Sequence, residues 1–209
     1  DNAGIKHAGA GRNLREAQQP ATLPIREASR VIVFSLGSTT SGIPTAWSAE
    51  EHRPGLHVIE TQGNDPIRAL ARQIDEVKRP GDIVIASIHW AGNWGYKIPS
   101  NQKEFAHRLV DEAGVDIVHG HSSHHVKAIE VYKGRLILYG CGDFINDYEG
   151  IRGYEEFRGD LALMYFAELN PASGELLALR MIPTHVRRFR ASLAAKPDIL
   201  WFETLLNRE

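Results

Sequence analysis

Histidines gather in one part of this 209-residue sequence. Six of the ten lie between His89 and His125, and four of those fall in the seven residues from His119 to His125. The neutral imidazole nitrogen is a good ligand for Zn²⁺, Mn²⁺, Fe²⁺ or Ni²⁺. The clustering therefore indicates a metal site, and the alternative is a hydrogen-bonded loop that holds no ion.

Two predicted strands must position these side chains. Residues 82–89 and 115–119 are short, apolar, β-branched runs typical of buried strands, and a predicted helix over 100–112 connects them. This order predicts parallel strands, and open α/β sheets bind ligands at the carboxyl ends of such strands. His89 ends the first strand and is one candidate ligand.

The segment that follows the second strand supplies the other candidates, His121 and His124. Gly120 is expected to let the backbone turn sharply, so that both imidazoles face one ion. We interpret the two neighbouring histidines as structural. His119 alternates with an apolar strand residue, and His125 adjoins His124 and should point away from it.

The rest of the chain predicts one α/β domain over residues 1–209. The first half alternates strand, loop and helix, with further strands expected over 30–36 and 56–60 and a helix opened by Asp65-Pro66. The second half predicts antiparallel strands and a terminal helix, over 127–132, 135–139, 160–169, 175–182, 184–190 and from Pro197.

Composition excludes several classes of protein. A net charge of −2 leaves no electrostatic footprint for nucleic acid, so no nucleic-acid partner is expected. No apolar run approaches the 18 or so residues that span a bilayer. Cys141 is the single cysteine, which excludes an intrachain disulfide and a cysteine-based zinc site.

Three other motifs allow alternative interpretations. Cys141 lies between two glycines and could act as a thiolate nucleophile, although a structural cysteine is the simpler interpretation. Residues 9–14 begin like a dinucleotide fingerprint but lack its third glycine, which predicts a turn. The arginine cluster at 187–190 predicts a solvated strand face or a surface for an anionic polymer.

Several motifs in order resemble the CapA-type poly-γ-glutamate capsule biosynthesis family. The resemblance extends over roughly residues 4–170 and is carried by the segments at 4–13, 88–90, 99–102, 114–124 and 130–144. The family is similar in fold to calcineurin-like metallophosphoesterases. The resemblance therefore implies an αββα sandwich with a two-metal site.

The resemblance also implies roles for particular residues. His89, His121 and His124 match the metal-ligating histidines that come later in the family's sequence. His121 and Asp143 are assigned catalytic roles, Asp143 by orienting a ligand histidine or a water. The implied cofactor is a divalent transition metal (Mn, Fe or Zn), two ions in the full-length protein and one or none in this chain. The expected substrate cleft is formed by Trp90, Asn93, Trp94, Tyr96 and Glu130.

The chain departs from the family pattern in three ways, one of which is Asp143, a carboxylate in the segment 142–144 where the family commonly reads G-N-F. Asn93 stands where the family has an acidic residue. The family's early metal ligands, a G-D after the first strand and an N-H pair, precede the segment that matches Gly4. Because the sequence begins Asp1-Asn2, without methionine or a signal peptide, we interpret it as the C-terminal portion of a longer domain whose first strands are missing.

The expected function is a metal-dependent phosphoesterase-like hydrolase associated with synthesis of poly-γ-glutamate or another capsule or envelope polymer. Its partners would be an anionic polymer or phosphoester substrate and a membrane-associated capsule synthesis machinery. The alternative is a non-catalytic accessory protein that binds the polymer or an export partner on the same scaffold. The sequence leaves open the oligomeric state and the choice between cell envelope and cytoplasm.

Overall fold

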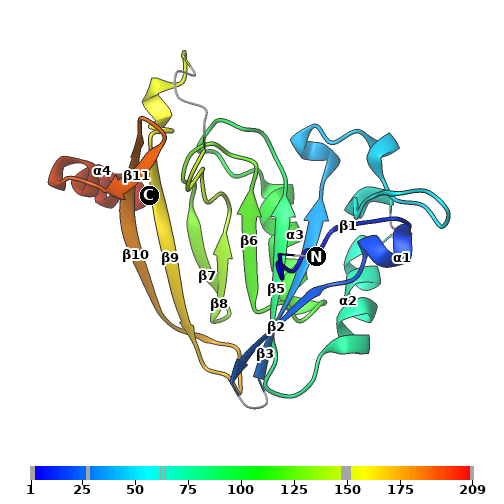
Figure 1. Cartoon of the computed structure of the whole chain (residues 1–209). Helices are drawn as coiled ribbons and strands as arrows, with labels where there is room; N and C mark the ends of the chain where they lie inside the picture. The colour runs from blue at the N-terminus through cyan, green and yellow to red at the C-terminus, as the bar shows by residue number, and fades with distance from the viewer. Residues whose placement is uncertain (1–2, 27–28, 62, 64, 147–151, 208–209) are drawn as a thin grey trace.

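A six-stranded sheet forms the centre of the computed structural model, which describes residues 3–26, 29–61, 63, 65–146 and 152–207 (Figure 1). The strand order is β2-β3-β5-β6-β8-β7. Strands β3, β5, β6 and β8 run parallel, and β2 and β7 pair antiparallel at the two edges. The bounds are β2 (Ala21–Arg26), β3 (Ser29–Gly37), β5 (Ile83–His89), β6 (Ile117–His121), β7 (Ile129–Tyr132) and β8 (Arg135–Leu138).

Helices α2 (Pro66–Val77) and α3 (Ser100–Asp111) cover one face of this sheet. Helix α2 begins as its sequence predicts, because the Asp65 side chain accepts a hydrogen bond from the Arg68 N–H and proline occupies the first turn. The apolar stripes of both helices share one buried cluster with the even-numbered residues of β3, β5 and β6. The cluster includes Ile67, Leu70, Ile74, Ala106 and Leu109 of the helices and Val84, Ile88 and Val118 of the strands.

A second sheet of order β11-β10-β9 packs on the other face. It contains β9 (Leu161–Leu169), β10 (Leu176–Arg187) and β11 (Arg190–Leu193), and α4 (Lys196–Leu206) packs on β9 and β10. Apolar residues Ile117, Leu136 and Leu138 of the central sheet contact Tyr165, Leu169, Leu176 and Leu179. Helices α2 and α3, the two packed sheets and α4 make up the expected sandwich of the αββα type, which is confirmed.

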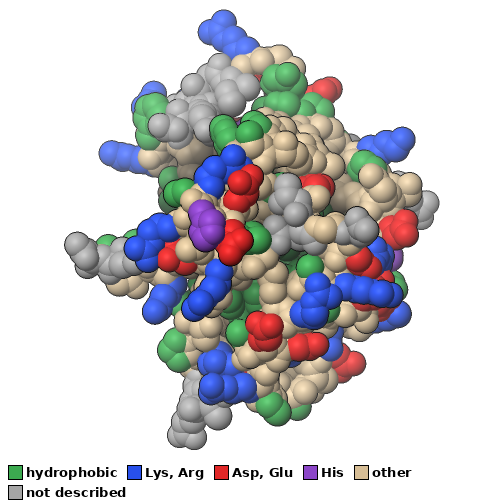
Figure 2. Space-filling view, turned by 90° about the vertical axis from the view of Figure 1, so that its right-hand side faces the viewer, with side chains coloured by type: hydrophobic (Ala, Val, Ile, Leu, Met, Phe, Trp, Pro, Cys, Tyr) green, Lys and Arg blue, Asp and Glu red, His purple; other side chains and the backbone are tan. Residues whose placement is uncertain are grey.

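Shorter elements lie at the edge of the central sheet nearest the N-terminus. Strand β1 (Ala10–Gly11) pairs with β4 (Gly55–Leu56), and α1 (Leu14–Ala17) follows β1. Three 3₁₀ turns follow β3 and β4, η1 (Thr39–Ser41), η2 (Thr45–Trp47) and η3 (Ile59–Thr61), whereas a fourth, η4 (Glu155–Phe157), precedes β9. On the face seen in Figure 2, acidic and basic side chains are interspersed.

Several predicted element bounds were wrong. Strand β2 was missed because Pro24 interrupts its pattern, and it is tolerated there because β2 is an edge strand. The strand expected over 56–60 ends at Leu56 and gives way to η3. The helix predicted over 100–112 is α3, which ends at Asp111, and its N-cap is Pro99, which offers no side-chain hydrogen bond.

The two strands predicted over 175–182 and 184–190 are largely one strand, β10, which continues through Pro183. Proline is accommodated at the point where the pairing with β11 ends: the Pro183 carbonyl accepts the Ala194 N–H over 3.0 Å, and the register with β11 runs from Thr184 onward. Two parts of the predictions lie outside the described residues. They are Asp1-Asn2, on which the interpretation of the chain start rests, and residues 208–209 of the predicted terminal helix. No helix in the described part of the chain is long and apolar enough to cross a bilayer.

Candidate functional site

His89 and His121 form the centre of the site, at the carboxyl ends of β5 and β6. The two residues are direct partners in the parallel ladder. Their Nδ1 atoms lie 3.1 Å apart, with ring centroids 5.2 Å apart and ring planes tilted by 54°. The main chain fixes this arrangement, since the Trp90 N–H donates to the His121 carbonyl over 3.0 Å.

Both imidazoles belong to the sheet face that packs towards the second sheet. Burial, with smaller contributions from the neighbouring His119 and His89, lowers the pKa of His121 to about 4. Burial also lowers the pKa of His89, with a smaller contribution from His124. The two rings are therefore neutral at pH 7, and each carries one nitrogen lone pair that can accept a proton donor or bind a metal.

The separation of the two nitrogens suits two arrangements. One Nδ1–H can donate to the other Nδ1 as an ordinary hydrogen bond. Alternatively both lone pairs can bind one ion: ligands at about 2.1 Å and at angles between about 90° and 109° lie about 3.0–3.4 Å apart. The observed 3.1 Å between His89 and His121 fits a shared ion.

His124 is oriented by a carboxylate. Its Nδ1 lies 2.7 Å from Asp143 Oδ2, and its Nε2 lies 3.3 Å from the Asn93 side-chain nitrogen. Asp143 also accepts a hydrogen bond from Asn146 over 2.8 Å. A carboxylate that holds one ring nitrogen while the other keeps its lone pair is the usual environment of a metal-binding histidine. The expected orienting role of Asp143 is consistent with this geometry.

The chain turns after β6 at a residue that the sequence did not indicate. Ser122, rather than Gly120, adopts the left-handed φ of 116°, and its hydroxyl donates to the Ala91 carbonyl over 3.0 Å. Gly120 remains within the strand. A Cβ there would lie 2.5 Å from Trp90 Nε1 and 2.6 Å from the Leu138 carbonyl oxygen. The expectation for Gly120 was wrong: it permits the close approach of the Trp90 indole.

The predicted ligands do not form a complete metal site. Within residues 3–146 and 152–207, apart from the few undescribed positions there, no group of three or more His, Cys, Asp or Glu side chains is arranged to hold an ion. The structure does bring His89 and His121 together, and His124 is near enough to lower the pKa of His89. These residues supply imidazole donors suited to part of a metal site.

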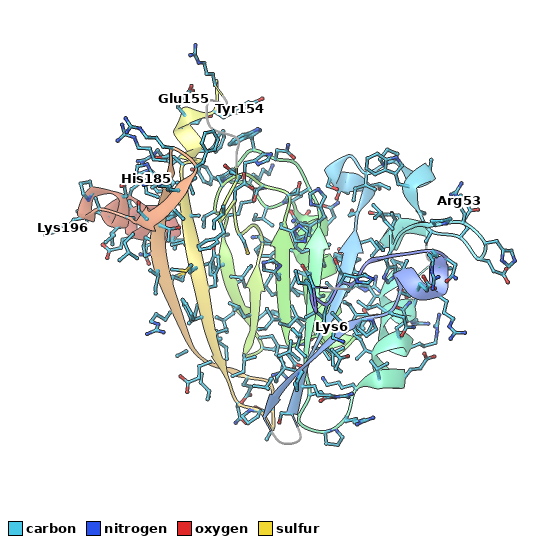
Figure 3. All side chains as sticks on the ribbon, viewed as in Figure 1. Lys6, Arg53, Tyr154, Glu155, His185 and Lys196 are labelled. Atoms are coloured by element: carbon cyan, nitrogen blue, oxygen red, sulfur yellow. The ribbon has the colours of Figure 1, made fainter. Side chains whose placement is uncertain are left out.

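Two of the expected cleft aromatics pack on the histidine loop. The Trp94 ring lies 5.3 Å from that of His124 and stacks on Tyr154 at 4.3 Å. Tyr96 contacts the ring of His125 edge-on at 4.8 Å. Tyr154 lies at the end of the molecule to which the parallel strands point (Figures 1 and 3). These aromatics hold the loop that carries His124.

The histidines interpreted as structural make hydrogen bonds that fit that role. His119 Nδ1 lies 3.0 Å from the Ser87 hydroxyl, its direct partner on β5. His125 is fully buried, and its Nδ1 lies 3.1 Å from the Val126 carbonyl oxygen. Both side chains thus stabilise the strands and the loop around the histidine pair.

Glu130, expected in the substrate cleft, lies on the edge strand β7 and contacts helix α3. Its carboxylate accepts a hydrogen bond from the Tyr139 hydroxyl over 2.6 Å and lies 2.9 Å from His107 Nε2. The His107 ring in turn stacks on Tyr132 at 3.7 Å. Glu130 therefore joins β7 to α3 in this structure.

Cys141 does not have the environment of a thiolate nucleophile. The residue follows β8, and burial raises the pKa of its thiol to about 12. The thiol is therefore protonated at neutral pH, and an activated cysteine requires the opposite shift. The structural interpretation of Cys141 fits this environment.

One polar side chain near the site, Gln102, ends the segment 99–102 that carries the family resemblance, but no role was predicted for it. Gln102, in the first turn of α3, is 8% exposed, and neither polar atom of its side chain has a hydrogen-bond partner among the described residues. Its burial could have been predicted from its spacing. Gln102 precedes the inward-facing Phe105 by three residues and Ala106 by four, so its amide lies on the apolar face of the helix.

The αββα sandwich, with histidines at neighbouring strand ends, is of the metallophosphoesterase type. Residues 1–148 match the family described as bacterial capsule synthesis protein PGA_cap. The chain belongs to this family, which confirms the resemblance to CapA-type proteins.

Named relatives agree with this membership. The chain is 46% identical over 207 residues to a probable polyglutamine synthesis accessory protein of Mycobacterium tuberculosis (strain H37Rv), a match that covers 99% of this chain and 54% of the relative. It is 29% identical over 163 residues to the PGA biosynthesis protein CapA of Bacillus subtilis (strain 168), covering 78% of this chain and 39% of the relative. The chain thus spans about half the length of the first of these relatives.

Proposed function

We propose that this chain supplies the late histidine ligands of a divalent-metal hydrolase site of the phosphoesterase type. The observation that carries the proposal is the 3.1 Å separation of His89 Nδ1 and His121 Nδ1 at neighbouring strand ends. Membership of a capsule synthesis family supports a role of the whole protein in making poly-γ-glutamate or another capsule or envelope polymer.

Each candidate residue has a distinct task in this proposal. His89 and His121 hold an ion through their facing nitrogens, and His124 binds through Nε2 while Asp143 keeps its ring in place. The bound metal, Mn, Fe or Zn, lowers the pKa of a water and polarises a phosphoryl oxygen. The residues of this chain hold at most one ion, and the whole protein holds two.

The proposed substrate is a phosphoester or an anionic polymer, and the proposed partner is a membrane-associated capsule synthesis machinery. Asn93 fits a role in substrate or ligand positioning, because it contacts His124 in two ways. Its side-chain nitrogen lies next to His124 Nε2, and its main-chain carbonyl accepts the main-chain N–H of His124 over 3.0 Å. An amide there can hold a neutral imidazole without adding charge to the site.

A second candidate function is a non-catalytic accessory protein that binds the polymer or an export partner. The observation that favours it is the lack, within the described part of the chain, of a three-ligand metal group. The word "accessory" in the name of the mycobacterial relative agrees with it.

Metal analysis and hydrolysis assays on the full-length protein distinguish the two functions. We expect a bound transition metal by mass spectrometry and hydrolysis of bis(p-nitrophenyl) phosphate that is lost in His121→Ala and retained in His52→Ala, a change at an exposed histidine. A full-length protein without metal and without hydrolysis would contradict the metalloenzyme. Metal-free binding of polyglutamate that survives His121→Ala would favour the accessory function.

A further inference from the structure

The hairpin between β10 and β11 carries three arginines and a phenylalanine. Arg187 and Arg190 are direct partners that close the hairpin, and Arg188 and Phe189 form its two-residue turn. All four residues are exposed, Phe189 to 65%. None of the three guanidinium groups makes an ion pair or a side-chain hydrogen bond with the residues that the structure describes. Their charges are therefore available to a partner.

The hairpin holds these side chains at a cost to its own stability. A two-residue turn of this kind needs a positive φ at both central residues, and asparagine and glycine favour it. Here Arg188 has a φ of 51° and Phe189 a φ of 57°. Arg187 and Arg190 are like charges directly opposite each other, which disfavours their pairing. The folding of the hairpin does not explain these residue types, whereas binding to a partner does.

Positive charge continues beyond the turn. Residues 187–196 contain four basic residues, the last of them Lys196, and no acidic residue, although the whole chain has a net charge of −2. Two carboxylates that flank this segment in the fold, Asp160 and Asp198, both pair with Arg158, over 2.8 and 2.9 Å. The segment is therefore a local basic surface, and it is complementary to an anionic partner.

The hairpin lies at the end of the molecule that carries the histidine site. His185, two residues before the hairpin, and Tyr154 lie at this same end (Figure 3). Strand β9, which pairs with β10, is preceded by Gly159, where a Cβ would lie 3.3 Å from the His124 carbonyl oxygen. A partner bound at the hairpin would therefore lie at the end of the sheet where the proposed metal ligands are.

We propose that this hairpin docks the chain on a membrane that contains anionic lipids. The three arginines line a hollow of about 420 Å³, and guanidinium groups bind phosphate through paired N–H donors, so the hollow takes lipid phosphate. The Phe189 ring enters the boundary between headgroups and acyl chains, as aromatic side chains beside basic residues do in interfacial segments. An anionic polymer would use the arginines but leave the exposed ring without a role.

Flotation of the 209-residue chain with lipid vesicles, without added metal, tests the docking. The probes are vesicles of phosphatidylglycerol mixed with phosphatidylcholine and vesicles of phosphatidylcholine alone. We expect partition to the anionic vesicles only, weakened by added salt because salt screens exposed charges. Partition that is equal for the two vesicle types, or absent from both, would overturn the proposal.

Replacing the three hairpin arginines by glutamine should weaken this partition about a hundredfold, since each basic residue near an anionic surface contributes about fivefold. The matched control carries Arg12→Gln, Arg15→Gln and Arg53→Gln, exposed arginines around α1 and β4, across the molecule from β11 (Figure 1). It loses the same charge and should bind as the unmodified chain does. Equal losses in the two variants would overturn the proposal. Arg188→Gln alone, expected to lose about fivefold, gives the same test if the triple variant does not fold.

Phe189→Asn tests the contribution of the ring. Asparagine accepts a left-handed φ, so the turn should be kept, which circular dichroism checks. Partition should fall about fivefold, because the ring no longer leaves water. Leu177→Asn is the control, since Leu177 is 60% exposed at the other end of β10, and it should bind normally. Unchanged partition in Phe189→Asn, or hairpin-dependent binding of poly-γ-glutamate without vesicle binding, would assign the hairpin to an anionic polymer and overturn the proposal.

His121→Ala separates the docking from the proposed hydrolase. The hairpin shares no residue with the histidine pair, so vesicle binding should be unchanged in this variant. Only the consequence that docking turns the metal site towards the membrane rests on the proposed function. A full-length protein without metal would contradict the hydrolase and leave the docking intact. Loss of vesicle binding in His121→Ala, with the fold intact by circular dichroism, would overturn a separate docking surface.

Discussion

His89 and His121 are direct partners at the ends of two parallel strands, and their Nδ1 atoms face each other over 3.1 Å. If the pair binds a metal, loss of one ring removes a direct ligand. His121→Ala should then weaken Zn²⁺ binding more than about a hundredfold, beyond the 10–100-fold effect of outer-shell changes. Isothermal titration calorimetry measures this, with exposed His52→Ala as the control. Equal affinity in both variants would contradict a shared ion.

The contact between Asp143 and His124 predicts a smaller effect. Asp143→Asn retains the shape but loses the negative charge that holds the imidazole. We expect metal affinity to fall about 10–100-fold without a change in fold. Asp111→Asn, which alters a surface ion pair with Lys133, should leave the affinity unchanged. The prediction fails if the two variants bind metal equally well.

Two glycines next to the site should respond differently to the same substitution. Gly120→Ala places a Cβ against the Trp90 indole and two carbonyl oxygens, so it should lower the free energy of unfolding by about 1–3 kcal/mol. Gly92→Ala meets nothing within 4 Å and should be nearly neutral. Urea denaturation of both variants tests the close packing described for Gly120, and a neutral Gly120→Ala would refute it.

Stability should fall with acid partly because of His57, which is 2% exposed and whose pKa burial lowers to about 4. His57 is protonated below about pH 6.5 in the unfolded chain but only below about pH 4 in the folded chain. Its contribution to the free energy of unfolding is therefore fully present above pH 6.5 and is lost as the pH falls from 6.5 to 4. A shift from 6.5 to about 4 corresponds to about 3 kcal/mol.

The His57→Gln variant isolates this contribution, because glutamine does not titrate. Between pH 6.5 and 4 the unfolding free energy should fall more steeply in the unmodified chain than in the variant, by about 3 kcal/mol over the window. Urea denaturation at several pH values measures both slopes. Parallel slopes would show that His57 is not held neutral in the folded state.

Much of the site could be predicted from the sequence, because the end of a buried strand is visible where a run of apolar residues stops. The apolar runs before His89 and His119 indicated two buried parallel strands, and the helix between them brought their ends to one edge. The register that places His89 opposite His121 is a pairing between distant segments. No local pattern carries it, and the predicted second strand ended two residues early, at His119 instead of His121.

The features that the sequence did not indicate depend on tertiary contacts. The turn at Ser122 requires a left-handed φ that serine rarely adopts, and the surrounding loop enforces it. The spacing of Gln102 indicates its burial, but the lack of a hydrogen-bond partner for its side chain among the described residues depends on the segments packed around it. The path of β10 through Pro183 likewise depends on where β11 stops pairing.

The register of β5 and β6 links the folding of the sheet to the assembly of the site. Ser87 pairs with His119 and His89 with His121, so two successive rungs on one face carry polar pairs inside the sandwich. A slip of one residue would set Gly120 opposite His89 and turn the β6 histidines into the core under the helices. A sheet with the wrong register would therefore bury imidazole rings without hydrogen-bond partners. Chains that fold stably have the histidine pair assembled as part of the sheet.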